Sequence, residues 1–409
     1  MRILLLFGFL VFLDIYAFQA IRFIGQNWPA WLRTGIFVLY WSVPVIAIGY
    51  MLAAQAGVID NWSKGLVSIV RAFIFIFYLA KFFVAVILLV DDLRRLLFKA
   101  YEGIAGPVKF DKGRSRFMAQ LALIIGAIPL GSLSYGIIRN RYRYQVRREI
   151  VRISGLPLNL KGLKVIQISD IHSGSFTDTE PVRKAVDLIN EEEADLVFFT
   201  GDLVNYRSEE AMDYVDVFDK IRAKYGVYSV LGNHDYGDYV QWDSPAEKTA
   251  NMENLYDIHR RLGWQLLRNE SALVPVNGHN IGVIGVENYS AHPRFPKYGD
   301  LKTAYGQASE ADLKILLSHD PSHWMDQVIL PEYQDIALTL SGHTHGMQFG
   351  IEIPGWIKWS PIKYVYKEWA GLYKEANQYL YVNRGLGYLG YPGRVGILPE
   401  ITVLELQEA

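Results

Sequence analysis

The chain has 409 residues, which is too long for one ordinary domain and suggests two structural units. Its 41 Lys and Arg residues nearly balance its 42 Asp and Glu residues, so the net charge of -1 gives no basic signal for nucleic-acid binding. The chain contains no cysteine, which excludes disulfides, thiolate metal ligands and cysteine nucleophiles.

Residues 1 to about 140 are dominated by apolar runs and predict an α-helical transmembrane bundle of about four spans. Each run is close to the roughly 20 apolar residues that a bilayer-spanning helix requires. The runs are Ile3–Ile24, Gly35–Gly57, Leu66–Val90 and Phe117–Ile138. Four buried helices of a soluble domain are the alternative, but the run that begins at Phe73 is apolar on every side, which favours surrounding lipid.

Three charged residues lie within these spans, namely Asp14, Arg71 and Lys81. A charge that faces lipid is costly, so Lys81, in the middle of its span, should face the bundle interior and pair with Asp14. Arg71 lies near a span end, where its side chain can reach the interface. A structural ion pair between helices is the favoured interpretation, and a path for lipid or protons is the alternative.

Basic residues on both sides of the fourth span make the orientation a close decision. The loop 91–116 and the segment 139–152 are both rich in Lys and Arg and lie on opposite sides of the membrane. Residues 142–150 roughly alternate between polar and apolar, which indicates a strand within a connecting segment 141–160. The loop 91–116 is then the better topogenic signal, and it places the carboxy-terminal domain outside the cytoplasm.

From Leu163 the chain alternates short β-branched runs with helical segments, which predicts a layered α/β domain over residues 161–409. The expected strands are Leu163–Ser169, Leu196–Thr200, Tyr228–Leu231, Ile281–Val286, Ile315–Ser318, Ile336–Ser341 and Tyr379–Asn383. The expected helices or helical turns are Pro181–Glu193, Glu209–Tyr225, Asn251–Leu262 and Ala308–Leu313.

Polar motifs follow five of these strands, each at the point where the strand ends. Their side chains are Asp170 and His172, then Asp202, then Asn233, His234 and Asp235, then His319, then His343 and His345. Loops at the ends of parallel strands meet in one crevice, so we expect these side chains to lie close together.

Carboxylate, amide and imidazole groups together suit a pair of divalent metal ions that act on a phosphate. Without cysteine, the mixed set fits manganese, iron or zinc better than a structural zinc site. The chain has no phosphate-binding GxxxxGK[ST] motif, no GxSxG motif and no HExxH motif, so these three alternatives fail.

In this order, the motifs resemble those of the calcineurin-like metallophosphoesterase family over about residues 160–409. The resemblance implies a layered β-sandwich flanked by helices, which hydrolyses a phosphate ester by attack of a hydroxide that bridges two metal ions. The implied ligands are Asp170, His172 and His345 for one metal, Asn233, His319 and His343 for the other, and Asp202 for both. His234 would orient the phosphate or protonate the leaving oxygen, and Asp235 would fix the ring of His234.

One bacterial branch of this family is membrane-anchored and often begins with a twin-arginine export signal. Arg114, Arg116 and the apolar span after them are similar to a degraded form of that signal, and residues 381–387 and 399–402 also resemble this branch. Three further spans depart from its single anchor. The resemblance implies an integral protein of the bacterial inner membrane, with the catalytic domain outside the cytoplasm.

Aromatic residues and lysines alternate between Gly350 and Tyr373, a composition that suits a membrane interface. We expect Trp356 and Trp359 to form a wall of the site that faces lipid, although an ordinary packed loop is equally compatible with the pattern. Arg384 could bind a substrate phosphate or serve as a structural ion-pair partner.

A phosphorylated lipid is the favoured substrate, as a phosphomonoester or a pyrophosphate-linked lipid. A phosphodiesterase acting on soluble substrates is the alternative within the enzyme class. A non-catalytic membrane component for sensing or transport, with a metal-binding domain, is the alternative outside it. The near-neutral charge and the membrane anchor argue against a nucleic-acid substrate.

Overall fold

The computed structural model describes residues 2–105, 112–353 and 355–409. The chain divides into two compact units, Met1–Ile137 and Ile138–Ala409. Each unit has cores of its own: small clusters between helices in the first, and three large clusters around β-sheets in the second. The predicted fold class, a helical membrane bundle followed by an α/β domain, is confirmed.

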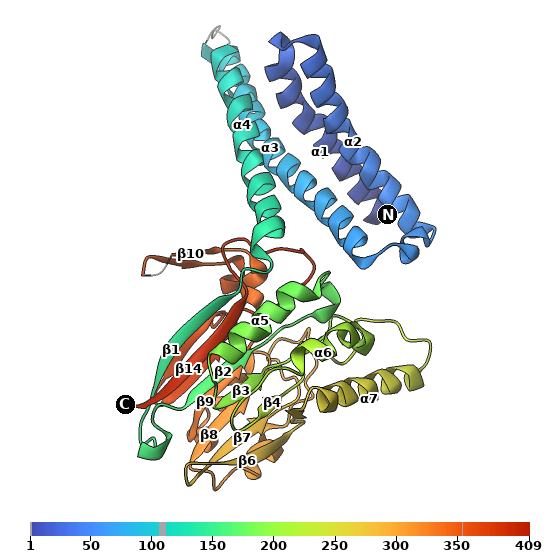
Figure 1. Ribbon diagram of the computed structural model, residues 1–409. Helices are drawn as coiled ribbons and strands as arrows, with labels where there is room; N and C mark the ends of the chain where they lie inside the picture. The colour runs from blue at the N-terminus through green and yellow to red at the C-terminus, as the bar shows by residue number, and fades with distance from the viewer. Residues whose placement is uncertain (1, 106–111, 354) are drawn as a thin grey trace. The chain divides into compact units, whose positions relative to one another are not determined.

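The first unit, Met1–Ile137, here named the membrane unit, consists of helices that are long and apolar enough to cross a bilayer (Figure 1). They are α1 (Arg2–Ile24), α2 (Ala30–Gln55), α3 (Lys64–Ala105) and α4 (Lys112–Tyr135), the last continued by a π-helical turn, Gly136–Asn140. The third helix runs well past its predicted end, so most of the expected loop 91–116 is helical. Lys109, one of the basic residues counted in that loop, lies outside the described residues.

Lys81 and Asp14 form the predicted ion pair within the spans. The Nζ of Lys81 lies 2.6 Å from Oδ1 of Asp14, and both side chains are buried. Tyr78 donates its hydroxyl to Oδ2 of Asp14 at 2.9 Å, and Tyr40 donates to the backbone carbonyl of Asp14 at 2.7 Å. Arg71 donates to the hydroxyl of Tyr50 at 2.6 Å. Lys81 and Asp14 therefore join α3 to α1 inside the bundle.

We expect Lys81→Met alone to destabilise the protein in detergent, because it leaves the Asp14 carboxylate buried without its cation, at a cost of about 3–5 kcal/mol. The double variant Asp14→Asn, Lys81→Met should regain most of that stability, since no charge is then left unpaired. Thermal unfolding of the full chain measures both effects. If the stable double variant lost phosphoester hydrolysis, the pair would have a functional role instead of a purely structural one.

The second unit, Ile138–Ala409, is built on two six-stranded sheets and a separate two-stranded hairpin, β10–β11. The first sheet has the order β1-β14-β2-β3-β4-β5, and the second β12-β13-β9-β8-β7-β6. Strands of the first sheet are β1 (Gln145–Ile153), β14 (Glu400–Glu408), β2 (Lys164–Ile168), β3 (Leu196–Phe199), β4 (Val227–Ser229) and β5 (Trp264–Leu266). Those of the second are β12 (Gly371–Glu375), β13 (Gln378–Val382), β9 (Ile336–Ser341), β8 (Leu313–Leu317), β7 (His279–Gly285) and β6 (Glu270–Val276).

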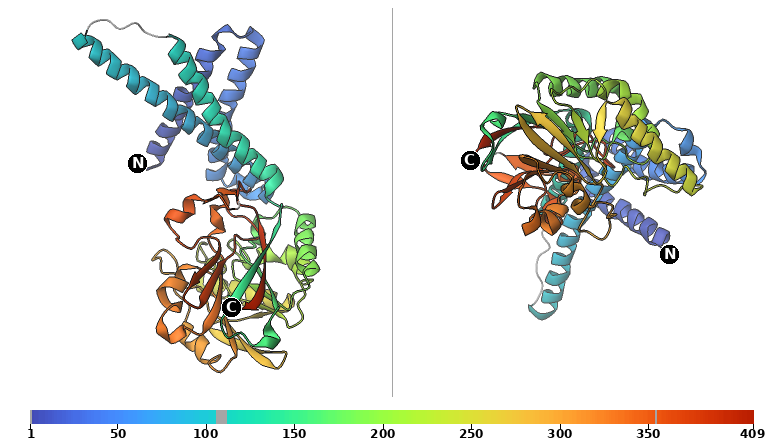
Figure 2. Two further views of the ribbon diagram at one scale, coloured as in Figure 1. Left: turned by 90° about the vertical axis from the view of Figure 1, so that its left-hand side faces the viewer. Right: turned by 90° about the horizontal axis from the view of Figure 1, so that it is seen from below.

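The two sheets pack face to face and carry helices on their outer faces. Alternate residues of one strand show this, since Phe198 lies in the core between the sheets and Phe199 lies in the core under the helices. Helices on the first sheet are α5 (Thr179–Glu191), α6 (Val215–Phe218) and α7 (Pro245–Arg261), and α8 (Leu301–Gly306) covers the second. Figures 1 and 2 show β14 lying beside β1 along one edge of the sandwich.

Two predictions of helices or helical turns hold only in part. Residues 308–313 form turns that lead into β8, and the helix lies earlier, where the Asp300 side chain caps the amide of Thr303. The Asp312 carboxylate instead accepts the amide of Asn280, which ties this segment to the start of β7. The predicted helix 209–225 is a 3-10 helix, Ser208–Tyr214, followed by the short α6.

The parallel strands position the site. In the first sheet β2, β3 and β4 are parallel neighbours, and in the second β7, β8, β9 and β13 are parallel neighbours. Hydrogen bonds link the ends of the two sheets, since the amide of His343, after β9, donates to Oδ1 of Asp170, after β2, at 3.0 Å, and the side-chain amide of Gln167 in β2 donates to the carbonyl of Ser341 in β9 at 2.8 Å. The polar motifs at these strand ends therefore meet at one edge of the sandwich.

Candidate metal centre

The backbone is strained where the polar motifs lie. Five predicted ligands have a positive φ: Asp170 (52°), His172 (47°), Asp202 (61°), His343 (69°) and His345 (49°). Residues with a Cβ rarely adopt this left-handed conformation, and it persists only where the surrounding structure enforces it. Its concentration in these five residues indicates that the strand ends turn sharply in order to point their side chains at a common centre.

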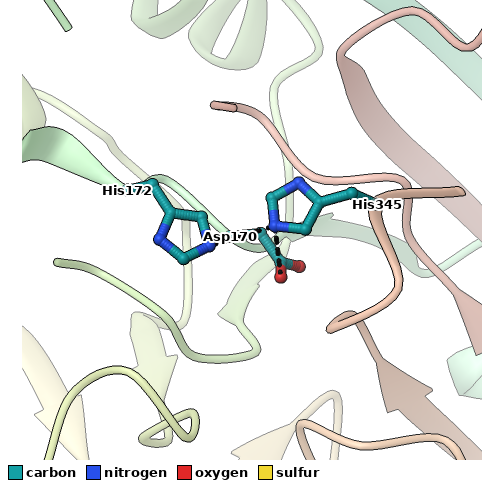
Figure 3. Close-up of side chains that lie close together, drawn as sticks. All are labelled: Asp170, His172 and His345. Atoms are coloured by element: carbon teal, nitrogen blue, oxygen red, sulfur yellow. Dashed lines mark hydrogen bonds and ion pairs between the residues drawn. The ribbon is translucent and has the colours of Figure 1, made fainter. Parts of the chain in front are cut away.

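The first cluster contains Asp170, His172 and His345 (Figure 3). The Nε2 atoms of His172 and His345 lie 3.0 Å apart, and Nε2 of His345 lies 3.2 Å from Oδ1 of Asp170. All three residues are buried. Two imidazole nitrogens facing each other beside a carboxylate form a donor set that fits a divalent cation.

The second cluster is defined by the predicted ligands Asn233, His319 and His343. The possible ligand atom of His319 lies within 4.8 Å of those of Asp170 and Asp202, and its ring centroid lies 5.2 Å from that of His343. Oδ1 of Asn233 lies 2.8 Å from Nδ1 of His343. The buried Nε2 of His319 has no hydrogen-bond partner among the described residues, although it lies 3.2 Å from Oδ2 of Asp202. A buried nitrogen without a hydrogen-bond partner is costly unless a cation binds it, so this set also fits a metal ion.

Asp202 lies between the two clusters. Its Oδ2 is 3.2 Å from Nε2 of His319 and 3.5 Å from Nε2 of His172. Its Oδ1 accepts the backbone amide of His234 at 2.8 Å, which fixes the orientation of the carboxylate. One oxygen of Asp202 therefore faces both clusters, as a bridging ligand must.

The electrostatics of the centre keep its carboxylates ionised. Burial alone would raise the pKa of Asp202, but the imidazoles of His319 and His234 hold that pKa well below its ordinary value. Burial alone would lower the pKa of His319, but the carboxylates of Asp202 and Asp170 raise it to about 10. For His172 burial prevails over Asp202 and lowers the pKa to about 3. The centre thus attracts positive charge.

The imidazoles of two candidate ligands are oriented by groups behind them. Nδ1 of His319 donates to the carbonyl of Thr200 at 2.7 Å. Nε2 of His343 lies 2.8 Å from the hydroxyl of Tyr366, which donates to Oδ2 of Asp320 at 3.1 Å. In each ring the other nitrogen faces the centre. Such supporting hydrogen bonds fix the tautomer and the ring plane of a metal-binding histidine.

We expect Tyr366→Phe to weaken metal binding by about 10–100-fold, because it removes the hydroxyl that links His343 to Asp320. The change leaves the ring and its packing in place. A metal titration of the full chain, followed by calorimetry, measures the affinity. Tyr364→Phe is the matched control, since this substitution removes the same hydroxyl oxygen from a side chain that lies two residues away and is 75% exposed. Equal affinities for both variants would contradict the assigned role of Tyr366.

Asp235 does not hold the ring of His234, so this prediction is corrected. Nδ1 of His234 donates to the carbonyl of Asn205 at 2.8 Å. The Asp235 carboxylate instead accepts the backbone amides of Gly232, Asp202, Leu203 and Val204 at 2.8–3.2 Å. Burial and the neighbouring Asp202 raise the pKa of Asp235 to about 7. Asp235 therefore fixes the loop that carries Asp202, and acts on the centre through the backbone.

Three further predicted residues lie away from the centre. Arg384 is buried and paired with Glu400 at 2.5 Å and with Glu352 at 2.6 Å, so it is the structural ion-pair partner that was one of its two expected roles. Trp356 is 77% exposed, and Trp359 is partly exposed. None of the three lines the pocket at the metal ligands.

That pocket has a volume of about 690 Å³ and opens beside the candidate ligands. Its lining combines polar residues, among them His234 and the tyrosines Tyr206 and Tyr239, with apolar ones. The apolar residues are Pro293, Phe295, Ile362, Val365 and Leu389, and Arg294 and His292 also line the pocket. The pocket can therefore hold a phosphate at the ligands and an apolar group next to it.

The histidines outside the motifs have ordinary partners. His323 contacts the hydroxyl of Ser318 and the side chain of Gln327, and His259 contacts the hydroxyl of Ser229. His279 lies 3.5 Å from Asp312. His292 lines the pocket, with its ring 4.7 Å from that of Tyr366.

Sequence reasoning missed the residues that support the centre. Asp320 directly follows the ligand His319, which is a usable signal in the sequence. Asn205 acts through its backbone carbonyl, so its identity gives no signal. Tyr366 belongs to the aromatic segment that was expected to form a wall of the site, but its contact with His343 is visible only in the folded chain.

Comparisons with known proteins agree with both halves of the chain. The family described as "Probable Calcineurin-like phosphoesterase, transmembrane domain" matches residues 1–141, and the family "Calcineurin-like phosphoesterase" matches residues 163–347. The uncharacterized metallophosphoesterase YkuE of Bacillus subtilis is 30% identical over 70% of this chain and 94% of its own length.

Two other relatives differ in length and in name. A transmembrane protein with metallophosphoesterase domain from Danio rerio is 30% identical over 71% of this chain, which covers 62% of that protein. The UDP-2,3-diacylglucosamine pyrophosphatase LpxG of Chlamydia trachomatis is 27% identical over 56% of this chain and 79% of its own.

Proposed function

The chain belongs to the calcineurin-like phosphoesterases, and we propose that it uses two divalent metal ions to hydrolyse the phosphate ester of a phosphorylated lipid. Family membership and the bundle of four potential spans make it a membrane-associated metal-dependent phosphoester hydrolase. The lipid substrate and the two-metal mechanism are the proposal.

The position of Asp202 carries the two-metal proposal. One carboxylate oxygen faces His172 of the first cluster and His319 of the second. Asp170, His172 and His345 would hold one ion, and Asn233, His319 and His343 would hold the other. When bound, a pair of ions supplies positive charge to the phosphate oxygens and lowers the pKa of an attacking water.

The remaining chemistry is assigned to His234. Its Nδ1 is held by the Asn205 carbonyl, which leaves Nε2 to exchange a proton, and the residue lines the pocket beside Asp202 and Asn233. A proton given to the leaving oxygen stabilises the departing alcohol as the P–O bond breaks. The ring of Tyr239, whose centroid lies 4.6 Å from that of His234, limits the rotation of the imidazole.

Three features support a lipid substrate. The pocket is lined by apolar residues, among them Phe295, Ile362 and Leu389, as well as by the candidate ligands. The chain carries its own membrane unit, which keeps the catalytic unit near a bilayer. The relative LpxG is named for a diacylated substrate with a pyrophosphate bond. A phosphomonoester or a pyrophosphate-linked lipid fits this combination.

The proposal is tested with the full chain in detergent micelles, after removal of metal and return of Mn²⁺, Fe²⁺ or Zn²⁺. Release of phosphate or headgroup is measured from lipid phosphomonoesters, pyrophosphate-linked lipids and soluble p-nitrophenyl phosphodiesters. We expect metal-dependent turnover that is faster on a lipid of the panel than on the soluble esters. Turnover of soluble diesters alone would indicate a soluble-substrate phosphodiesterase. Two bound ions without turnover on any member would indicate a sensing or transport component.

The membrane side of the catalytic unit is a separate proposal. The basic residues between the third and fourth spans favour the cytoplasm for that connection and the extracytoplasmic side of a bacterial inner membrane for the catalytic unit. A single cysteine placed at Leu158 should then react with an impermeant maleimide in intact spheroplasts. Reaction only after lysis would reverse the assignment.

A further inference from the structure

We propose that the catalytic unit docks on the lipid bilayer through an exposed apolar surface beside its pocket, here named the apolar rim. The apolar rim consists of Met347, Phe349, Ile351, Ile353, Trp356, Tyr364 and Val365, all of them exposed. The inference goes beyond the proposed function, because it does not depend on which phosphoester is the substrate.

The hairpin at the centre of the apolar rim carries apolar side chains on its outer face and a charged side chain on its inner face. In β10 (Ile351–Ile353), which pairs with β11 (Ile357–Trp359), Glu352 points inward and binds Arg147 and Arg384. Its neighbours Ile351 and Ile353 point outward and are exposed. Successive residues of a strand face opposite sides, and a hairpin in water normally turns its apolar side inward. The arrangement suits a hairpin whose outer face contacts something apolar.

The apolar rim is continuous with the mouth of the pocket. Val365 is exposed and also lines the pocket, and the next residue, Tyr366, points inward to His343. Met347 lies two residues after the ligand His345. One segment thus has an inner face on the metal centre and an outer face on the apolar rim. Whatever covers the apolar rim also borders the entrance to the site.

The end of the fourth span identifies the occupant as the bilayer. Asn140 is the last residue of that candidate span and belongs to the catalytic unit, where its Nδ2 donates to the carbonyl of Arg394 at 3.1 Å. Val395, the next residue, pairs with the base of the hairpin: its amide donates to Gln348 at 2.8 Å, and its carbonyl accepts the amide of Gly350 at 2.9 Å. Arg394 therefore hydrogen-bonds to the end of a membrane span, and its neighbour Val395 hydrogen-bonds to the base of the hairpin.

The residue types of the apolar rim also fit the interface between hydrocarbon and headgroups. Trp356 and Tyr364 combine a large apolar ring with a polar group, a combination enriched at this depth of a membrane. The exposed Lys363 lies next to Tyr364, with its Nζ 5.3 Å from the ring centroid of that tyrosine. A lysine beside an interfacial aromatic ring suits anionic lipid headgroups.

The absence of cysteine allows a direct test with the full chain. Trp356→Cys and Leu158→Cys are each labelled with an environment-sensitive fluorophore and placed in nanodiscs of phosphatidylethanolamine and phosphatidylglycerol. Both native side chains are 77% exposed. Leu158 lies beyond the far end of β1, a strand of 9 residues that begins close to Asn140 and spans about 30 Å. We expect quencher-labelled lipid to reduce emission from position 356 only, and aqueous iodide to reduce it from position 158 only.

Other results would overturn the assignment. Strong iodide quenching at both positions, without lipid quenching, would place the apolar rim in water. Position 356 could instead be protected from iodide without being quenched by lipid. If that protection disappeared in nanodiscs that hold one copy of the chain, it would indicate a contact between two copies. Ile353→Cys in β10 and Leu273→Cys in β6 form a second pair if the first fails to fold, since both side chains are exposed and Figure 1 shows the two strands at opposite ends of the catalytic unit. Because the readout needs no turnover, its failure is distinguishable from failure of the proposed function.

Discussion

Asp202→Asn is expected to reduce metal-dependent hydrolysis on the order of 10³-fold or more, because the two candidate metal positions share this anionic ligand. The substitution is close to isosteric. The amide oxygen can still accept the backbone amide of His234, as Oδ1 does now. Only the oxygen that faces both His172 and His319 becomes an NH₂ group, which cannot bind a cation. The loss should therefore come from the metal centre and not from misfolding.

Turnover and metal content of the purified full chain are measured together for this variant. Asp216→Asn is the matched control, since it makes the same change on the exposed side of α6 and should leave both quantities unchanged. We expect the Asp202 variant to bind less metal than the wild type. Wild-type turnover by Asp202→Asn would show that this oxygen is not shared by two ions, and the two-metal proposal would then fail.

The positions of the site residues were predictable because they depend on strand ends. Buried β-branched runs indicate strands, and a polar residue just after such a run lies at the edge of the sheet. This reasoning predicted the α/β fold class, and the resemblance of the motifs in their order pointed to the family; both are confirmed. It also listed Asp170, Asn233 and His319 as neighbours without any knowledge of how the strands are ordered.

The supporting residues were not predictable in the same way. Tyr366 reaches His343 because a turn after β11 points it inward while Tyr364 and Val365 point outward. That sorting depends on the path of the hairpin, and a run of aromatic residues in the sequence shows no such division. Arg384 is similar, since its partners Glu352 and Glu400 lie in β10 and at the start of β14.

Asp235 shows a limit of reasoning by proximity. It directly follows His234, so a carboxylate–imidazole contact was the natural expectation. Its carboxylate points away from the ring and accepts four backbone amides instead. In this turn the carboxylate binds the backbone amides in preference to the imidazole, because a buried N–H without an acceptor is costly. The sequence shows which side chains are present but not which backbone groups are left without partners.

His234→Asn should lower turnover of a lipid phosphoester by about 10²–10⁴-fold, which is the usual contribution of a positioned general acid. The shorter amide can still donate to the Asn205 carbonyl, but it has no group at the position of Nε2. Metal content should stay at the wild-type level, because the predicted ligands are untouched. His279→Asn, the same change at a partly exposed histidine beside Asp312, is the control.

The choice of leaving group makes the test specific for proton donation by His234. An alkoxide leaving group needs a proton as the P–O bond breaks, whereas p-nitrophenolate is stable without one. The His234 variant should therefore lose much more activity on an alkyl ester than on the p-nitrophenyl ester. An equal loss on both esters, accompanied by loss of metal, would mean that His234 supports the metal centre and that another group supplies the proton.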